Sequence, residues 1–216
     1  MQSSSRIAFA FAFLTSACGG ASQPSPLLDP HPDSLAQQAP DSFRVQFTTS
    51  KGPFVMQVVR AWSPRGVDRF YYLARHQYYD GVKFFRNLPG FMAQFGIHGD
   101  PDVNTVWVDR SIPDDSVRAS NLRGYVSYAM GGPNTRATQL FVNKSDNDHL
   151  DRMGFAPIGR VVEGMQVVDS LYEGYGEGPP GGFGPDQGRI ISQGNRYLES
   201  FFPRLDSIVT ARIVRD

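Results

Sequence analysis

Apolar and polar residues alternate in several short stretches of the chain, and this pattern predicts β-strands. Phe43, Val45 and Phe47 alternate with polar residues, which is the two-residue period of a half-buried strand. Turns that contain glycine or proline separate this stretch from others of similar length. The further predicted strands span residues 54–61, 82–87, 91–97, 124–130, 139–143, 156–162 and 208–214.

Helical spacing occurs in only two places. Apolar residues recur three and four positions apart between residues 67 and 76, which predicts a short amphipathic helix. Apolar residues between 165 and 172 mark a second helix. Polar residues dominate 98–123, and glycine and proline are frequent from 174 to about 204, so both segments are predicted to be loops. The pattern favours an all-β-dominated domain, a closed or nearly closed antiparallel barrel with two helices at its ends.

The beginning of the chain has the pattern of an export signal. Arg6 provides a positive charge, an apolar stretch runs from 7 to 14, and small residues follow. This stretch is too short to span a bilayer, which takes about 20 residues. Cys18 then resembles the lipid-bearing cysteine of a bacterial lipobox, although Leu14 lies one position further from it than is usual. The alternative is ordinary signal cleavage near Ala17, which leaves a free cysteine.

The segment after Cys18 has the composition of a flexible tether. Glycine, serine, proline, glutamine and aspartate dominate it, and such a segment buries too little apolar area to offset the entropy lost on ordering. A lipid on Cys18 would hold the exported protein at the membrane of the cell envelope. The predicted organisation is a signal peptide over 1–17, a lipid-anchored flexible linker over 18–41 and one folded domain over 42–216.

Composition removes several classes of function from consideration. The chain has 21 basic and 21 acidic residues and no basic run, which argues against a nucleic-acid partner. A single cysteine rules out an intramolecular disulfide and any zinc site built on several cysteines. The four histidines form no ligand-spaced pairs, so no metal site is predicted. Hydrophobic patterning and composition by themselves do not identify a function.

Three blocks of sequence resemble the signatures of the cyclophilin family. The first, residues 84–94, reads FFRNLPGFMAQ and resembles F-x-R-x-x-x-G-F-M-x-Q. The second, residues 127–142, reads SYAMGGPNTRATQLFV and is similar to S-M-A-x-x-x-P-N-x-x-x-S-Q-F-F-I. The third, residues 150–165, contains LD followed by GFAPIGRVVEGM. The blocks stand in the family's order and spacing, and the resemblance covers roughly residues 43–175 plus the last strand.

The resemblance implies a closed eight-stranded antiparallel β-barrel capped by two α-helices. It also implies peptidyl-prolyl cis/trans isomerase activity on proline-containing polypeptides, without a cofactor or a metal, in a chain that we expect to be monomeric. The family's catalytic positions fall on Arg86, Phe91 and Gln94. Its substrate-binding positions fall on Met92, Ala129, Met130, Gly131, Gln139, Phe141, His149, Leu150 and Phe155.

Two of these positions depart from the family's pattern. His149 stands where cyclosporin-sensitive relatives carry tryptophan, and Phe155 stands where histidine is frequent at the rim of the pocket. The resemblance therefore implies weak cyclosporin binding, which an inhibition constant in the nanomolar range would refute.

These residue types suit rotation about an X-Pro bond. Amide resonance sets a barrier of about 18–20 kcal/mol, and no bond is broken, so the enzyme has to bind the twisted amide better than the planar ones. Arg86 stays charged and offers several donors in a rigid fork, which can hydrogen-bond the prolyl nitrogen as resonance is lost. Gln94 would orient that fork. An apolar socket that includes Phe91, Met92 and Phe141 would hold the ring still.

Other interpretations of these residues remain open at this point. Phe91, Met92 and Phe141 could be ordinary core residues, and Arg86 a surface charge. A non-catalytic module that binds proline-containing peptides would use the same groove. The isomerase interpretation requires the Arg86 guanidinium to lie beside the rings of Phe91 and Phe141, with an open groove between them.

Overall fold

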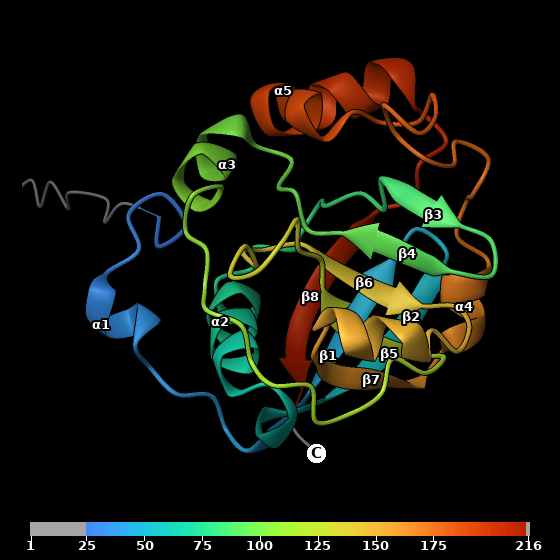
Figure 1. Ribbon diagram of the computed structural model, residues 1–216. Helices are drawn as coiled ribbons and strands as arrows, with labels where there is room; N and C mark the ends of the chain where they lie inside the picture. Colours follow the sequence, from blue (N-terminus) through green and yellow to red (C-terminus); the bar gives the residue numbers. More distant parts are fainter. Residues whose placement is uncertain (1–24, 215–216) are drawn as a thin grey trace, which may run out of the picture.

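One antiparallel sheet forms the body of the protein, which a computed structural model describes over residues 25–214 (Figure 1). Its strands lie in the order β3-β4-β6-β5-β7-β2-β1-β8. They are β1 (Ser42–Thr49), β2 (Gly52–Val59), β3 (Arg86–Leu88), β4 (Met92–Phe95), β5 (Tyr125–Tyr128), β6 (Leu140–Asn143), β7 (Pro157–Glu163) and β8 (Ile208–Val214). The helices are α1 (Pro32–Leu35), α2 (Pro64–Arg75), α3 (Pro101–Trp107), α4 (Met165–Asp169) and α5 (Gln187–Phe201), with 3-10 helices η1 (Arg60–Trp62) and η2 (Asp148–Met153).

The alternating residues of β1 form the centre of the core, as their period predicts. Phe43, Val45 and Phe47 are buried, and the residues between them face outward. β1 pairs antiparallel with β2, which places Phe47 opposite Phe54 with their rings stacked 4.8 Å apart. Burying each such side chain is worth roughly 1.5–3 kcal/mol, so these strands anchor the sheet.

Both predicted helices are present. α2 starts at Pro64, where proline's fixed φ suits the first helical position, and it buries Val67, Phe70 and Leu73 against the sheet. The second predicted helix is α4, which buries Val168 and ends at Asp169. The helical spacing in the sequence therefore located the two helices that cover the sheet most closely.

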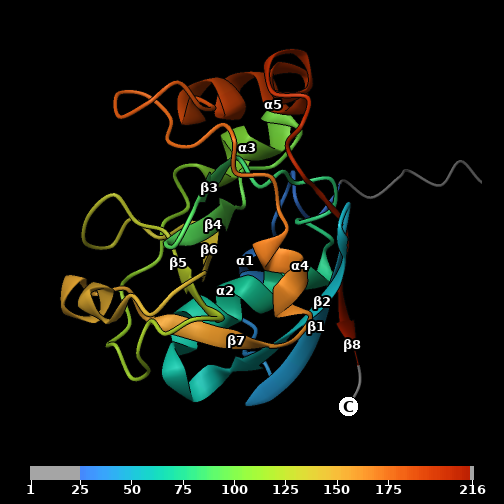
Figure 2. The same cartoon turned by 90° about the vertical axis from the view of Figure 1, so that its right-hand side faces the viewer.

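The expectation of a closed barrel is wrong, because the sheet is an open half-barrel. Within residues 25–214, the segments that precede β3 and β8 form the isolated bridge between Lys83 and Ser207, but β3 and β8 themselves are not paired. The two strands lie well apart in the second view (Figure 2). β3 is only three residues long, and Phe85 just before it packs into a second hydrophobic cluster under α5 instead of continuing the ladder.

Two helices occupy segments that the sequence predicts to be loops. Asp100 is the N-cap of α3, and its carboxylate accepts a hydrogen bond from the Asp102 amide at 2.9 Å. α5 is kinked at Gly194, where φ is 60° and the Asn195 amide donates to the Gly99 carbonyl. The two helices lie side by side beyond one end of the sheet (Figures 1 and 2). The protein thus has more helices than the two that were expected.

Residues 25–41 lie against the domain, although the sequence predicts a flexible tether there. The carbonyls of Pro26 and Leu27 accept hydrogen bonds from Tyr72 Oη and Trp107 Nε1, each at 2.8 Å. Leu27 itself is buried. This segment therefore packs on α2 and α3.

The predicted signal peptide and Cys18 lie outside the described residues. Among the residues that the structure does describe, no helix has both the length and the apolar character needed to cross a bilayer.

Candidate active site

Arg86 and Gln94 face each other across the β3–β4 hairpin. The register pairs the two residues directly, and Gly90 takes up φ 65° at the turn between the strands. Arg86 Nη1 donates to Gln94 Oε1 at 3.0 Å, and Gln94 Nε2 donates onward to Gln139 Oε1 at 2.8 Å. The expected orientation of the arginine by Gln94 is therefore present as a direct hydrogen bond, and Gln139 extends the polar row to the next strand.

An apolar cluster separate from the main core lies beside this polar row. Met92, Phe141 and Leu150 are buried in it, and Phe91 and Phe155 are partly buried at its edge. The rings of Phe141 and Phe155 meet edge to face at 5.7 Å, a favourable aromatic geometry. Because its edge residues remain partly exposed, this cluster can accept an apolar ring from outside.

The polar row and the apolar cluster border one cavity of about 350 Å³, within the usual size of a ligand pocket. The Arg86 Cζ lies 6.0 Å from the centroid of the Phe91 ring. The guanidinium thus lies beside the Phe91 ring, and both border an open cavity that Phe141 also lines. The predicted site residues that line this cavity are Arg86, Phe91, Met92, Gln94, Ala129, Met130, Gly131, Gln139, Phe141, Leu150 and Phe155.

His149 does not line the cavity, unlike the other predicted site residues. It is exposed on η2, and its ring stacks on Phe91 with centroids 6.4 Å apart. Leu150, the next residue, points into the apolar cluster instead. His149 is therefore placed to support the Phe91 ring from the solvent side.

Sequence reasoning missed an acidic partner of Arg86. Arg86 Nε and Nη2 donate to the two carboxylate oxygens of Glu177, at 2.7 and 2.5 Å. The hydrogen bond and the charge of Arg86 hold the pKa of Glu177 below its usual value, against the opposing effect of burial. Glu177 follows Arg86 by 91 positions, in the segment predicted as a long loop, and no local pattern marks it.

Helices α3 and α5 add a further wall that was not expected. Trp107 and Val108, at the end of α3, line the same cavity as the predicted residues. Gln187 and Ile191 of α5 also line it. α5 buries Ile190, Tyr197 and Leu198, but the non-helical Gly194 separates Ile190 from the other two, so no continuous helical period marks this helix in the sequence.

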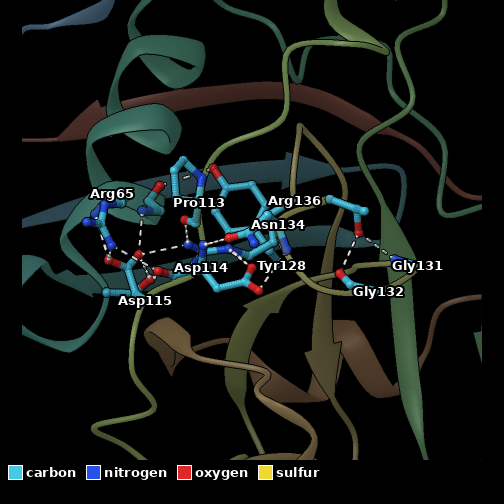
Figure 3. Close-up of polar contacts among 12 residues, drawn as sticks. Arg65, Pro113, Asp114, Asp115, Tyr128, Gly131, Gly132, Asn134 and Arg136 are labelled. Atoms are coloured by element: carbon cyan, nitrogen blue, oxygen red, sulfur yellow. Dashed lines mark hydrogen bonds and ion pairs between the residues drawn. The ribbon is translucent and has the colours of Figure 1, made fainter.

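The rim of the cavity near Gly131 is held by a polar loop contact (Figure 3). Asp114 and Asn134 bond reciprocally: the Asp114 amide donates to Asn134 Oδ1 at 2.9 Å, and the Asn134 amide donates to Asp114 Oδ2 at 2.8 Å. Thr135 Oγ1 accepts from the Gly131 amide at 2.9 Å and donates to the Gly132 carbonyl. The loop that carries the rim is thereby tied to a separate segment of the chain.

A buried arginine, Arg136, connects this loop to neighbouring segments of the chain (Figure 3). The side chain of Arg136 is 1% exposed, and its Nη2 lies 3.1 Å from Asp115 Oδ2. Its Nη1 donates to Ser63 Oγ at 3.2 Å, Nη2 also donates to the Pro113 carbonyl, and Nε lies 3.2 Å from Asp114 Oδ1. Nη1 and Nη2 have hydrogen-bond partners, whereas Nε makes no hydrogen bond within the described residues and only approaches the Asp114 carboxylate. The buried charge is balanced by the two aspartates, Asp114 and Asp115.

The aspartate of the buried pair is ionised by the same contacts. Burial raises the pKa of Asp115, but hydrogen bonds from Ser63 Oγ and from the amides of Gly66 and Arg65 lower it, as does the charge of Arg136. The net effect is a pKa below the usual value. The pair is therefore charged on both sides under ordinary conditions.

The fold and this cavity define a class of protein. An open antiparallel half-barrel resembles solved cyclophilin structures: the structure from Cryptosporidium parvum matches with a TM-score of 0.59 and 22% identity, over 81% of this chain and 99% of that one. A cyclophilin from Hirschia baltica matches with a TM-score of 0.59 and 19% identity, over 83% of this chain and 77% of its own. These likenesses establish a cyclophilin fold.

Sequence comparison identifies the family. The profile of the family described as "Cyclophilin type peptidyl-prolyl cis-trans isomerase/CLD" matches residues 44–182. The human peptidyl-prolyl cis-trans isomerase-like 3 is 33% identical over 133 residues, which is 59% of this chain and 80% of that protein. Peptidyl-prolyl cis-trans isomerase A of Dickeya dadantii is 33% identical over 144 residues, 64% of this chain and 75% of that protein.

The chain belongs to the cyclophilin family of peptidyl-prolyl cis-trans isomerases, and its enzyme class is that of the family. Cyclophilins bind proline-containing peptides as their substrates. The family match ends before α5 and β8, so the helix that adds a wall to the cavity lies outside it.

Proposed function

We propose that this protein accelerates cis/trans isomerisation of X-Pro bonds in exported proteins, and that it does so at the cell envelope, as a monomer anchored by a lipid on Cys18. The observation that carries the catalytic part is the position of Arg86, whose Cζ lies 6.0 Å from the Phe91 ring beside an open cavity. The export pattern of residues 1–17 supports the location.

The apolar cluster holds the proline ring. The ring enters between Phe91, Met92 and Phe141, and burial of its methylene groups is worth about 0.8 kcal/mol each. With the ring fixed, the acyl side of the amide rotates. Because the rigid aromatic side chains do not have to move during rotation, the socket binds both isomers and the state between them.

Arg86 stabilises the twisted amide. A guanidinium has five N–H groups. Three of them donate to Gln94 and Glu177, which leaves two, and one of these makes only a weak contact with Met92 Sδ at 3.9 Å. Among residues 25–214, one N–H of Arg86 therefore has no partner and can bond the prolyl nitrogen, whose lone pair becomes an acceptor as resonance is lost.

The strength of that bond sets the expected acceleration. Hydrogen bonds to charged groups contribute about 1.5–3 kcal/mol. A bond of this strength, formed only in the twisted state, speeds isomerisation roughly ten- to 150-fold, and the fixed ring adds to this. Arg86 alone is thus expected to supply a large part of the rate.

The flanking peptide binds as an added strand. Within the described residues, neither the amide nor the carbonyl of Met130 makes a backbone hydrogen bond, and Met130 lines the cavity. Gln139 on the neighbouring segment offers a further amide group. Backbone pairing of this kind accepts many sequences around the proline, which suits an enzyme with many client proteins.

The segment before β1 packs on the domain, and this limits how far the domain could lie from a lipid on Cys18. Residue 25 follows Cys18 by seven positions, and seven residues span at most about 25 Å when extended. Because residues 26 and 27 are bonded to α2 and α3, a lipid on Cys18 would keep the domain within that distance of the bilayer. The clients would then be chains close to the membrane surface.

The catalytic part is tested by Arg86→Ala on a proline-containing tetrapeptide, with cis/trans exchange followed by NMR. We expect the variant to lose most of the acceleration while its peptide affinity stays within about threefold, since the socket is intact. A wild-type protein that binds the peptide without accelerating exchange would instead favour the non-catalytic binding module.

The location is tested with Cys18→Ser expressed in a bacterium beside the wild type. We expect the wild type in the membrane fraction, with the added mass of a lipid on its N-terminal cysteine, and the variant in the aqueous fraction. A wild type found only in the aqueous fraction, without added mass, would contradict the lipid anchor.

A further inference from the structure

The segment between α4 and β8 brings one acidic side chain to the arginine of the site. Glu177 meets Arg86 in a two-pronged contact, with Nε–Oε1 at 2.7 Å and Nη2–Oε2 at 2.5 Å. Paired contacts of this kind fix the plane of a guanidinium as well as its position. Glu177 therefore limits how the fork of Arg86 can turn.

The loop around Glu177 is folded tightly enough to present this side chain in one place. The amide of Gly184 donates to the Glu177 carbonyl at 2.8 Å, and the Gly178 amide donates to Glu177 Oε1 at 3.0 Å. A Cβ at Gly182 would overlap the Glu177 carbonyl oxygen, so glycine is needed for this approach. The glycine-rich composition of the loop thus serves a close-packed turn.

Glu177 lies behind Arg86 rather than in the groove. Arg86 borders two cavities, and Glu177 lines only the second, of about 230 Å³, together with Pro185 and Gly188. The guanidinium edge that Glu177 occupies carries Nε and Nη2, while Nη1 faces Gln94 on the groove side. The carboxylate therefore holds the far edge and does not compete for the peptide site.

We propose that Glu177 is a positioning residue for the isomerase reaction, one that holds the Arg86 guanidinium so that its free donors point at the prolyl nitrogen. This inference rests on the proposed function of Arg86. Two partners, Gln94 in front and Glu177 behind, then determine the orientation of one fork. The segment that follows α4 thereby contributes to catalysis without touching the peptide.

The test compares Glu177→Ala and Glu177→Gln with a matched control. Glu199→Ala removes another carboxylate from the same segment, one that is 64% exposed and pairs with Lys83 at 3.6 Å, away from Arg86. We expect Glu177→Ala to lower kcat about tenfold with KM changed less than twofold. Glu177→Gln keeps one acceptor for Arg86 and should recover about a third of the wild-type kcat, and Glu199→Ala should match the wild type.

The same substitution made in an Arg86→Lys protein distinguishes a role in orienting the Arg86 guanidinium from a general structural role of Glu177. Lysine has no fork to orient, so in an Arg86→Lys protein the additional change Glu177→Ala should alter kcat less than twofold. Loss of activity from Glu177→Ala in both backgrounds, equal loss in Glu199→Ala, or a faster Glu177→Ala enzyme would each overturn the inference.

An NMR measurement distinguishes failure of this inference from failure of the proposed function. The Arg86 Nε–H bonded to Glu177 should exchange slowly with water in the wild type and at least tenfold faster in Glu177→Ala. If the wild type shows no isomerase activity, the proposed function fails, and the Nε–H exchange still decides whether Glu177 fixes the arginine. Equal exchange in the two proteins would overturn the inference even in an active enzyme.

Discussion

Two arginine–carboxylate pairs differ in burial: Arg86 lines the cavity, whereas Arg136 lies in the loop whose neighbouring residues Thr135 and Ala137 line it. The side chains of Arg86 and Glu177 are 24% and 38% exposed, whereas those of Arg136 and Asp115 are 1% and 5% exposed. Each arginine makes three hydrogen bonds to oxygen, so the difference between them lies in burial: Arg86 lines the cavity, and Arg136 does not. An arginine enclosed by the protein holds the fold together, and one that reaches an open cavity can act on a ligand.

The largest effect on stability is expected at the buried pair. Arg136→Ala leaves Asp115 charged in a buried position without its partner, and breaking a buried pair in this way costs about 3–5 kcal/mol. We expect a corresponding fall in the free energy of unfolding, measured in urea. The matched control is Arg65→Ala, because Arg65 also approaches Asp115, at 4.0 Å, but its side chain is 60% exposed. That pair should contribute less than about 1 kcal/mol.

Similar losses in the Arg136 and Arg65 variants would contradict the distinction between buried and exposed pairs. Such a result would mean that the burial of Arg136 does not determine how much its ion pair contributes to the free energy of unfolding.

The second-largest effect on stability is expected at α5, which follows the loop that carries Glu177. Gly194 in α5 has φ 60°, and a Cβ there would overlap the Gly99 carbonyl oxygen. Strain and overpacking together should cost Gly194→Ala about 2–3 kcal/mol, seen as a lower thermal midpoint. Gly176 also has positive φ, at 65°, but a Cβ there meets nothing within 4 Å, so Gly176→Ala should lose only about 1 kcal/mol. Equal losses would show that α5 does not depend on this close approach.

How much the sequence predicts depends on how local each feature is. Arg86 and Gln94 are eight positions apart in one hairpin, so a motif places them correctly. β1 and α2 follow from a simple period, because their buried residues recur without interruption. These features are determined by residues close together in the chain, so the sequence pattern alone is enough to predict them.

Other features depend on contacts that no local pattern records. Gly194 interrupts the apolar period of α5, and α3 is only seven residues long, so both helices were predicted as loops. Sheet closure depends on how far distant segments pair, and the pairing between residues before β3 and before β8 stops at Phe85, which packs under α5. The contact between Arg86 and Glu177 requires a fold in which residues 91 positions apart are brought together.

The smallest effect on the free energy of unfolding is expected at acidic pH. The pKa of Asp115 is lowered in the folded protein, so its contribution to stability is complete above its ordinary pKa of 3.8 and is lost as pH falls through the folded value. Below pH 3.8 the unfolding free energy should therefore fall with decreasing pH, by at most about 1.4 kcal/mol per pH unit for this one proton. Urea unfolding of Asp115→Asn should show a shallower slope, and Glu177→Gln should change the slope less because that carboxylate is more exposed. A larger change in Glu177→Gln would reverse the assignment of the two pairs.

The most direct test of the division between the two arginines is Arg86→Lys, with cis/trans exchange and urea unfolding measured on the same preparation. Lysine keeps the charge but loses the fork, and the pair that it disturbs is partly exposed. The expected result is isomerisation about 50-fold slower, with the free energy of unfolding within about 1 kcal/mol of the wild type. An exchange rate within threefold of the wild type would contradict the account, because a charge alone would then suffice where a positioned guanidinium is required.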